Sequence, residues 1–367
     1  MSSIKKKLSI WGSLLLVLAL VMTAVLPTPG LATTYPITLT DDLGREVTIE
    51  ALPVKIISLA PSNTEILFAL GLGDRVVGRT TYCDYPPEAL EKEDVGGPWG
   101  TYIDVEKIIV LNPDFILAEE INSKEVVDTL EDLGFTVFGI KSTDLDDLLD
   151  DIRTVGKITD TEAEADALID EMEGRIDAVT EETEGLSSEE KPRTFHISWH
   201  DPIYTSGSGT FIHDLVGKAG GVNIFADLEG WPVVDLEAVI GRDPEVIIVT
   251  AMGGTGSGTW EWVLTEPRLA DVSARQNGRV YSVESNWVER PGPRIVLGLE
   301  QMAKYIHPEI FIFVYYRAYS GDPSVVDTQD LLEAIGDWAD GTIPAGFSQA
   351  ITTSQLLQLI GEWAGLD

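Results

Sequence analysis

The sequence predicts an α/β protein with two similar lobes built on mainly parallel sheets, joined by one long α-helix and followed by a small C-terminal helical hairpin. Three observations predict this fold. Short apolar strands alternate with helices in residues 35–141 and again in 191–318, which is typical of parallel sheets covered on both faces. Residues 142–190 show helical periodicity and no strand pattern. Finally, one helix–strand unit occurs in both alternating stretches.

The repeated unit is clearest when Gly97–Glu119 is set beside Glu229–Thr250. Each stretch has a Trp, then Asp-x-Glu, a short apolar run, Asn/Asp-Pro-acid and a second apolar run. The interval between the two Asp-x-Glu glutamates, Glu106 and Glu237, equals the interval between the two prolines. We interpret the repeat as a helix followed by a strand, present once in each lobe after a duplication.

The N-terminal lobe, residues 35–141, should begin with a hairpin at Thr38–Glu50 and a strand at Lys55–Ala60. Ser62 or Asn63 is expected to cap the next helix, residues 64–73, because small polar side chains accept hydrogen bonds from first-turn amides. The alternation then predicts strands at 75–80, 114–119 and 136–140 and helices at 104–112 and 123–134.

The linking segment, residues 142–190, should form helices at 144–158 and 161–184. In the longer helix, four apolar residues lie at helical spacing and the opposite face is acidic, which is typical of a solvated surface. The four are Leu168, Met172, Ile176 and Val179.

The C-terminal lobe, residues 191–318, repeats the alternation. Strands are expected at 194–200, 245–251 and 279–285, and helices at 210–221, 235–243 and 291–311.

The tail, residues 324–367, carries a second internal repeat. Thr328–Asp340 is echoed by Thr353–Gly365, with matching Leu, Ile and Trp positions on one helical face. Two such helices can pack as an αα-hairpin. We expect a separable module that either holds a protein partner or caps the second lobe.

The N-terminus is typical of an export signal. Lys5–Lys7 form a positive region, Leu8–Leu26 is largely apolar, and Gly30 and Ala32 provide small residues for cleavage after Ala32. Residues 1–32 are therefore expected to be a signal peptide of an exported, extracytoplasmic protein. The alternative is an uncleaved anchor, because the apolar run is almost long enough to span a bilayer.

Charge and cysteine content exclude several classes of protein. The net charge is −36, from 25 basic and 61 acidic residues, so the surface would repel nucleic acid and anionic membranes. The single cysteine, Cys83, cannot form an intramolecular disulfide and lies far from the signal, so it is not a lipid-attachment site.

Aromatic residues cluster in the loops expected at the carboxyl ends of the strands, where α/β lobes bind ligands. Aromatic faces suit a broad, flat and mostly apolar ligand. These predicted loops hold Tyr82, Trp99, Trp199, His200, Tyr204, Trp231, Trp260, Trp287 and Arg290.

Across roughly Tyr35–Phe311 the chain resembles the substrate-binding proteins of ABC importers for cobalamin, haem and iron-siderophores, and it is most similar to the cobalamin-binding members. The segments that carry the resemblance, in order, are Ser58–Glu65, Thr80–Ala89, Asp201–Gly207, Gly220–Asp227, Trp231–Ile240 and Asn286–Ile295.

The resemblance implies a monomeric, non-enzymatic protein that captures a corrinoid between its lobes and delivers it to a permease dimer. The cobalt or iron compound would be cargo and not a prosthetic group, with a ferric siderophore or haem as the alternative ligand. Positions that line the corrinoid site of the family are matched by Tyr82, Trp99, Tyr204, Trp231, Asn286 and Arg290.

Glu106 and Glu237 match the family's docking acids, which meet arginines on the two copies of the permease. Such charge pairs set register and encounter rate more than affinity. The plainer alternative is that each glutamate is an exposed first-turn residue, favourable at a helix N-terminus.

Two departures from the family pattern affect the ligand. Glu119 stands where the cobalamin binders have an aromatic residue, and Trp199 and His200 stand where they have smaller apolar ones. His200 or Tyr82 could instead ligate iron or cobalt, although no metal site is assigned.

Anionic ferric siderophores are disfavoured by the shortage of cations. Such ligands would need several cations in the cleft, and the sequence offers Arg290, with Arg79 and Lys141 as further candidates.

Two other classes of protein fit less well. An enzyme is suggested by the glycine-rich stretch Met252–Trp260, but this stretch lacks the lysine of a phosphate-binding loop and no catalytic constellation accompanies it. An adhesive surface protein would explain the tail repeat but not the aromatic loops.

Overall fold

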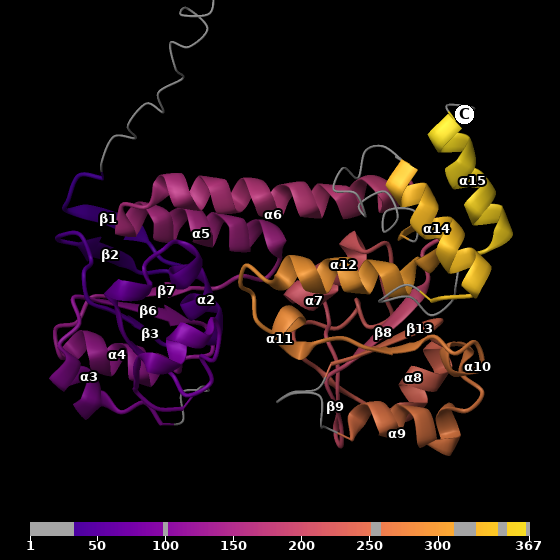
Figure 1. Cartoon of the computed structure of the whole chain (residues 1–367). Helices are drawn as coiled ribbons and strands as arrows, with labels where there is room; N and C mark the ends of the chain where they lie inside the picture. Colours follow the sequence, from indigo (N-terminus) through magenta and orange to yellow (C-terminus); the bar gives the residue numbers. More distant parts are fainter. Residues whose placement is uncertain (1–32, 98–101, 251–257, 312–327, 344–350, 365–367) are drawn as a thin grey trace, which may run out of the picture. The chain divides into compact units, whose positions relative to one another are not determined.

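The computed structural model describes residues 33–97, 102–250, 258–311, 328–343 and 351–364 (Figure 1). All elements below belong to one unit that begins at Tyr35. Two parallel sheets form the two lobes, and the predicted α/β class is confirmed.

The first lobe is a five-stranded parallel sheet in the order β5-β4-β3-β6-β7. Its strands are short, and all but the edge strand β5 are almost wholly buried, because helices cover both faces. The strands are β3 Ile56–Ser58, β4 Val76–Arg79, β5 Glu93–Asp94, β6 Phe115–Glu119 and β7 Val137–Ile140; the helices are α2 Pro61–Ala69, η1 Gly73–Arg75, η2 Pro87–Glu91, α3 Val105–Leu111 and α4 Lys124–Asp132.

The predicted cap of α2 is wrong. The N-cap is Ala60, without a side-chain hydrogen bond, and Pro61 occupies the first helical position. The φ angle of proline is fixed near the helical value, and proline has no backbone N–H that would need a partner in the first turn. The helix therefore begins one turn earlier than expected. Ser62 and Asn63 therefore lie buried in the first turn, and Asn63 Nδ2 donates to the carbonyl of Leu117 at 3.0 Å.

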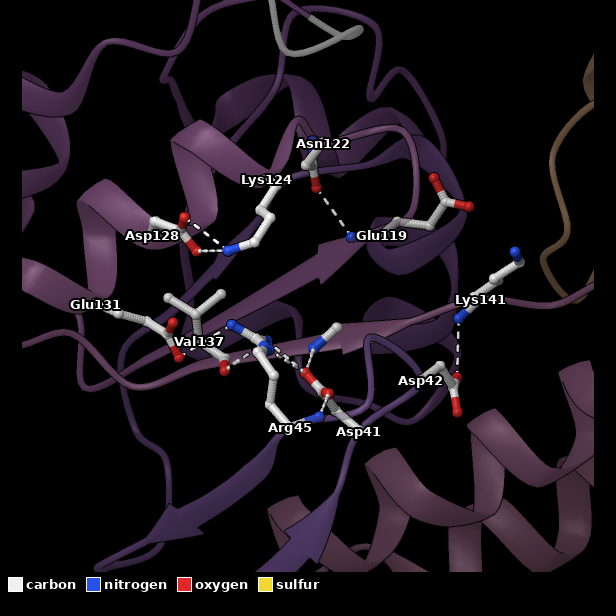
Figure 2. A network of polar contacts seen from close by, with 11 residues as sticks. Asp41, Asp42, Arg45, Glu119, Asn122, Lys124, Asp128, Glu131, Val137 and Lys141 are labelled. Carbon is white, nitrogen blue, oxygen red and sulfur yellow. Dashed lines mark hydrogen bonds and ion pairs between the residues drawn. The ribbon is translucent and has the colours of Figure 1, made fainter.

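A hairpin of β1, Ile37–Thr40, and β2, Glu46–Ile49, precedes this sheet as predicted. Buried Asp41 connects this hairpin to the sheet. The Oδ2 atom of Asp41 accepts from the amide of Gly139 in β7 at 3.0 Å and from Nε of Arg45 at 3.0 Å. Arg45 also pairs with Glu131 of α4 at 2.9 Å (Figure 2). One buried carboxylate thus ties the hairpin to the edge of the sheet.

The linking segment contains α5, Leu145–Thr159, and α6, Glu162–Thr183, which pack side by side (Figure 1). Between them, Asp160 adopts a left-handed conformation with φ of 57°. Three residues of the apolar face predicted for α6 are buried, and the fourth, Leu168, is half-buried against the same core. Helix α6 also contacts α7 and α12 of the second lobe. Arg175 of α6 donates two hydrogen bonds to Glu300 of α12, at 2.7 and 2.9 Å.

The second lobe is a four-stranded parallel sheet in the order β11-β8-β13-β14. A separate antiparallel sheet, in the order β12-β10-β9, accompanies it. The strands are β8 Arg193–Ile197, β9 Trp199–His200, β10 Ile203–Tyr204, β11 Val222–Asn223, β12 Val233–Val234, β13 Val246–Val249 and β14 Val280–Ser282; the helices are α7 Phe211–Lys218, α8 Leu236–Arg242, α9 Thr259–Thr265, η3 Pro267–Leu269, α10 Ser273–Gln276, α11 Ser285–Val288 and α12 Ile295–Ile306.

Two predicted boundaries in this lobe are wrong. The strand expected at 194–200 breaks at Ser198, and its last two residues join the antiparallel sheet instead. The helix expected at 291–311 is shorter, α12, because Pro291 and Pro293 precede it and Pro308 disfavours helical backbone at His307.

The repeated unit has the same local geometry in both lobes. Asp104 caps α3 by accepting from the amide of Lys107 at 2.9 Å, and Asp235 caps α8 by accepting from the amide of Ala238 at 2.6 Å. Each helix ends at a left-handed residue, Asn112 or Asp243, followed by proline and a buried strand. Short polar side chains tolerate that conformation, so the repeat in sequence is a repeat in structure.

The tail forms the predicted pair of helices, α14 Thr328–Asp340 and α15 Thr353–Ala364, which contact each other (Figure 1). Trp338 Nε1 donates to the hydroxyl of Thr353 at 3.1 Å. The buried apolar residues of the tail form a cluster of their own: Leu331, Ala334, Ile351, Leu356 and Leu359.

Among the described residues, no helix is both long and apolar enough to cross a membrane. The apolar run Leu8–Leu26 and the proposed cleavage point lie outside the described residues.

Because the tail cluster is self-contained, we expect deletion of residues 324–367 to leave the melting temperature of the remaining chain unchanged. Within the full chain, Leu356→Ala should unfold the hairpin, since loss of a buried leucine costs about 2–5 kcal/mol. Leu357→Ala is the matched control, because Leu357 is 61% exposed and Leu356 is 6% exposed.

Limited proteolysis followed by mass spectrometry would measure both variants, with cleavage in the tail expected for Leu356→Ala alone. A marked fall in the melting temperature of the truncated chain would contradict a separable tail.

Candidate ligand-binding site

The structure places the expected site residues near the carboxyl ends of several strands. Tyr82 follows β4, Trp199 and His200 follow β8, and Arg290 follows β14 and α11. Trp99 lies outside the described residues.

The loop assignment is wrong for several of them. Trp287 lies on α11, Trp260 lies on α9, and Trp199, His200 and Tyr204 lie in short strands. The predicted site residue Asn286 also lies on α11. These elements are only two to seven residues long, too short for a periodic pattern to show in the sequence. Trp287 is half-buried and packs against the main apolar core.

The antiparallel sheet β12-β10-β9, which we call the aromatic sheet, brings three of the predicted residues together. Tyr204 pairs with Trp199 on one side and with Val233 on the other. The side chains of Trp199, Tyr204 and Val233 are exposed, as is that of Trp231 just before β12, whereas His200 is half-buried. An exposed patch of this composition is unusual on a soluble protein and is typical of a binding surface.

His200 is fixed by its neighbours. Its ring stacks on Trp262 with centroids 5.4 Å apart and lies 5.4 Å from the ring of Trp199. Its Nδ1 is 3.0 Å from the hydroxyl of Thr259. Across the described part of the chain, no group of three or more His, Cys, Asp or Glu side chains could hold a metal ion.

A buried polar chain lies behind Trp231, and sequence reasoning missed it. Trp231 packs edge-to-face on Phe211 and on His196. His196 Nε2 is 2.9 Å from the hydroxyl of Thr250, which donates to Glu289 Oε1 at 2.5 Å. A histidine inside the apolar strand Arg193–Ile197 was the signal that could have revealed it.

Burial determines the protonation states of His196 and Glu289 in this hydrogen-bonded series. It lowers the pKa of His196 to about 3, so the ring is neutral. Because the hydroxyl of Thr250 donates to Glu289, it accepts from His196 Nε2–H, and Nδ1 is left as an unprotonated nitrogen without a hydrogen-bond partner among the described residues. Burial also raises the pKa of Glu289 to about 7, against the hydrogen bond from Thr250.

Two ion pairs, which we call the interlobe ion pairs, join the first lobe to the segment after α11. Arg294 donates to both carboxylate oxygens of Glu65, at 2.8 and 2.6 Å, and its guanidinium carbon lies 3.7 Å from the ring centroid of Tyr85. Arg290 Nη1 donates to Asp84 Oδ1 at 2.6 Å. Burial raises the pKa of Glu65 although Arg294 favours its charged form.

Glu119, the departure noted at the end of β6, is buried. Its Oε2 accepts from the amide of Ile121 at 3.0 Å. Its own amide donates to Asn122 Oδ1 at 2.9 Å (Figure 2). Burial raises its pKa to about 7. The carboxyl group thus stays partly protonated at neutral pH instead of presenting a full charge.

Two hollows are lined by residues of α6 rather than by the aromatic sheet. One of about 400 Å³ lies beside Glu65, Tyr85 and Arg294. The other, of about 700 Å³, lies among α5, α6 and α7 and is lined mostly by polar residues, including Asp177 and Lys218.

The two predicted docking glutamates occupy equivalent positions. Glu106 is exposed in the first turn of α3, and Glu237 is exposed in the first turn of α8. Glu237 lies 3.8 Å from Arg268, which also pairs with Glu266 at 2.8 Å. The surroundings of the two glutamates have therefore diverged.

The fold and the aromatic sheet define a two-lobed binding protein, and comparison with known proteins identifies its family. Residues 56–286 match the periplasmic binding protein family. The chain belongs to this family.

Two relatives and one solved structure show the extent of the similarity. An ABC transporter substrate-binding lipoprotein of Bacillus subtilis is 34% identical over 84% of this chain and 99% of its own length. The vitamin B12-binding protein of Vibrio cholerae is 33% identical over 69% of this chain and 88% of its own. A crystal structure of a possible iron-binding solute-binding protein of Staphylococcus epidermidis is 33% identical, with a TM-score of 0.61 over 70% of this chain and all of its own.

The raised pKa of Glu289 makes stability depend on pH. The folded protein holds the proton more firmly than the unfolded chain, whose carboxyl keeps its ordinary pKa of 4.5. The contribution of Glu289 to the free energy of unfolding should therefore fall as pH rises from about 4.5 to about 7, and then level off. Glu119 adds to the same slope.

We expect Glu289→Gln to reduce this slope and to stabilise the protein above pH 7, by on the order of 1–3 kcal/mol. Urea unfolding between pH 4 and pH 9 measures it, with exposed Glu261→Gln as the control. An unchanged slope in Glu289→Gln would show that this carboxyl is not buried in solution.

Proposed function

We propose that the protein is an extracytoplasmic solute-binding protein that captures a corrinoid and delivers it to the permease of an ABC importer. The observation that carries the proposal is the aromatic sheet, which exposes Trp199, Tyr204 and the adjacent Trp231 beside the carboxyl ends of the second sheet. The similarity to a vitamin B12-binding protein supports the same ligand class.

A corrin ring is broad, flat and largely apolar, so it suits such a surface. Each large aromatic side chain offers roughly 150–250 Å² of area and few rotatable bonds, so contact is gained at a small cost in entropy. Tyr82, Trp99, His200, Asn286, Trp287 and Arg290 complete the proposed site. The corrinoid is cargo, and the proposal includes neither a prosthetic group nor a catalytic role.

A ferric siderophore or haem is the second candidate ligand. The similarity to a structure described as a possible iron-binding protein favours it. His200 would offer an imidazole to a metal, although its Nδ1 is engaged with Thr259.

Delivery is proposed to use Glu106 and Glu237. Each lies at the start of the repeated helix, one in each lobe, so a two-fold symmetric permease dimer would meet one glutamate per subunit. Arginine is the natural partner, since its planar guanidinium matches a carboxylate.

Export and the tail complete the proposal. A signal peptide, residues 1–32, would be removed after Ala32, leaving a monomer with domains at 35–141, 142–190, 191–318 and 324–367. Unlike a lipoprotein, the chain offers no lipid site at Cys83, which is buried. A protein partner of the tail would contact its exposed Leu332 and Trp338, and the 324–367 deletion would then release protein from the cell envelope.

A titration tests the ligand. We expect cobinamide or cyanocobalamin to quench the tryptophan fluorescence of the mature protein with one-to-one stoichiometry. Trp199→Ala should weaken binding roughly tenfold or more, since stacked aromatic anchors carry much of the affinity at such sites. Trp260→Ala is the control, because Trp260 is also exposed but lies on α9, outside the aromatic sheet.

Strong quenching by haem or a ferric hydroxamate, with no response to corrinoids, would assign the second candidate. If none of these compounds binds, the proposed function is wrong.

Charge reversal tests docking. We expect Glu106→Lys and Glu237→Lys each to weaken binding to the reconstituted permease, by about tenfold, because like charges would face each other. The two effects should be close to additive, and corrinoid affinity should not change. Glu125→Lys is the matched control, since Glu125 is an exposed first-turn acid of α4.

Permease binding that survives the double reversal would show that both glutamates only stabilise their helices.

A further inference from the structure

The cations that an anionic ligand would seek near the site already have acidic partners. The sequence offers three candidates, and in the structure each faces a carboxylate of its own lobe or of the other. The pairs are Arg290 with Asp84 at 2.6 Å, Lys141 with Glu120 at 2.7 Å, and Arg79 with Asp94 at 3.5 Å.

The three pairs differ in how far water screens them. Arg79 is buried and also donates to backbone carbonyls, so it is structural. Lys141 and Glu120 are both well exposed, and such a pair has little effect. Arg290 is the informative case, because its side chain is only 15% exposed.

Asp84 is placed to neutralise Arg290. It lies in the turn after β4, two residues from Tyr82 and next to Tyr85. Its side chain is about half exposed, so a solute can reach it. Glu65 also approaches Arg290, at 3.9 Å, but both of its oxygens accept from Arg294. The two arginines and two acids together carry no net charge.

Two further acids are close to Arg290 in the sequence. Glu289 precedes Arg290 in the chain, and Glu284 caps α11. Arg290 Nη1 is paired with Asp84, so an anionic group that approaches this guanidinium also meets the Asp84 carboxylate and is repelled by it. A neutral or cationic ligand meets no such penalty, because it needs no free guanidinium.

We propose that Asp84 is a specificity-determining residue, which rejects anionic metal chelates by holding the charge of Arg290. This inference rests on the proposed function, since it concerns the ligand of the same site. Selectivity of this kind comes from a group that opposes the wrong ligand rather than from added contacts to the right one.

The test is Asp84→Asn in the mature protein. The amide oxygen can still accept from Arg290, while the competing charge is removed. Four ligands are titrated by tryptophan fluorescence: cobinamide, cyanocobalamin, haemin and a ferric tris-catecholate. We expect the variant to bind haemin and the ferric catecholate about tenfold or more tightly than the wild type does, and the two corrinoids within about twofold.

Two further variants make the result specific. Glu120→Gln frees the exposed Lys141 in the same way, and we expect no change in any of the four affinities. Asp84→Asn combined with Arg290→Gln should lose the gain for the anionic ligands, because no guanidinium remains to be freed. Thermal melting of each variant shows whether it is folded.

The outcomes separate the two proposals. If the wild type binds corrinoids and Asp84→Asn leaves the affinities for both anionic ligands unchanged, the role of Asp84 is wrong and the proposed function stands. If the wild type binds none of the four ligands, the proposed function fails. In that case a gain for anionic ligands in Asp84→Asn would still support the role of Asp84, and no gain would overturn it too.

Discussion

The buried face of α6 is the constraint on which the two lobes depend. Its apolar residues belong to one continuous cluster that includes Phe115 of the first sheet and Ile248 of the second. Burial of apolar area stabilises such a core by about 25 cal/mol per Å², and close packing leaves it little freedom to deform. The lobes are therefore joined by a shared core as well as by chain connectivity, and the bidentate pair of Arg175 with Glu300 adds a fixed register between α6 and α12.

The interlobe ion pairs are a second connection between the lobes, close to the proposed site. Glu65 is 3% exposed, and burying its charge is costly, as the direction of its pKa shift indicates. Such a pair adds little net stability compared with apolar residues, but losing one partner costs about 3–5 kcal/mol. Its consequence is geometric: the turn that carries Tyr82 and Asp84 is held against the segment that carries Arg290 and Arg294. The two halves of the proposed site are thus positioned before a ligand binds.

The sequence was sufficient for the fold because periodicity is a strong signal where elements are long or buried. Seven strands of the parallel sheets, α6 and both tail helices were predicted from apolar spacing, whereas the two-residue edge strands β5 and β11 were not. Prediction from the sequence failed where a local preference competes with tertiary contacts. Helix α2 begins at Pro61, before the predicted start, and the predicted strand is interrupted at Ser198, so Trp199 belongs to a different sheet. The chain from His196 through Thr250 to Glu289 was also missed, because its members are 39 or more positions apart and no pattern along the chain links them.

The two lobes share the same helix–strand unit but differ in the side chains that they contribute to the proposed site. Caps at Asp104 and Asp235 and left-handed residues at Asn112 and Asp243 preserve each helix–strand turn, since those positions set the geometry of the fold. The loops at the carboxyl ends of the strands are free of that requirement. In the described residues, the aromatic sheet lies at this end of the second lobe. The first lobe provides the acids Glu65 and Asp84, which pair with arginines of the second lobe. A flat apolar ligand would take most of its contact area from one lobe, while the charge that decides which ligands are tolerated comes from the other.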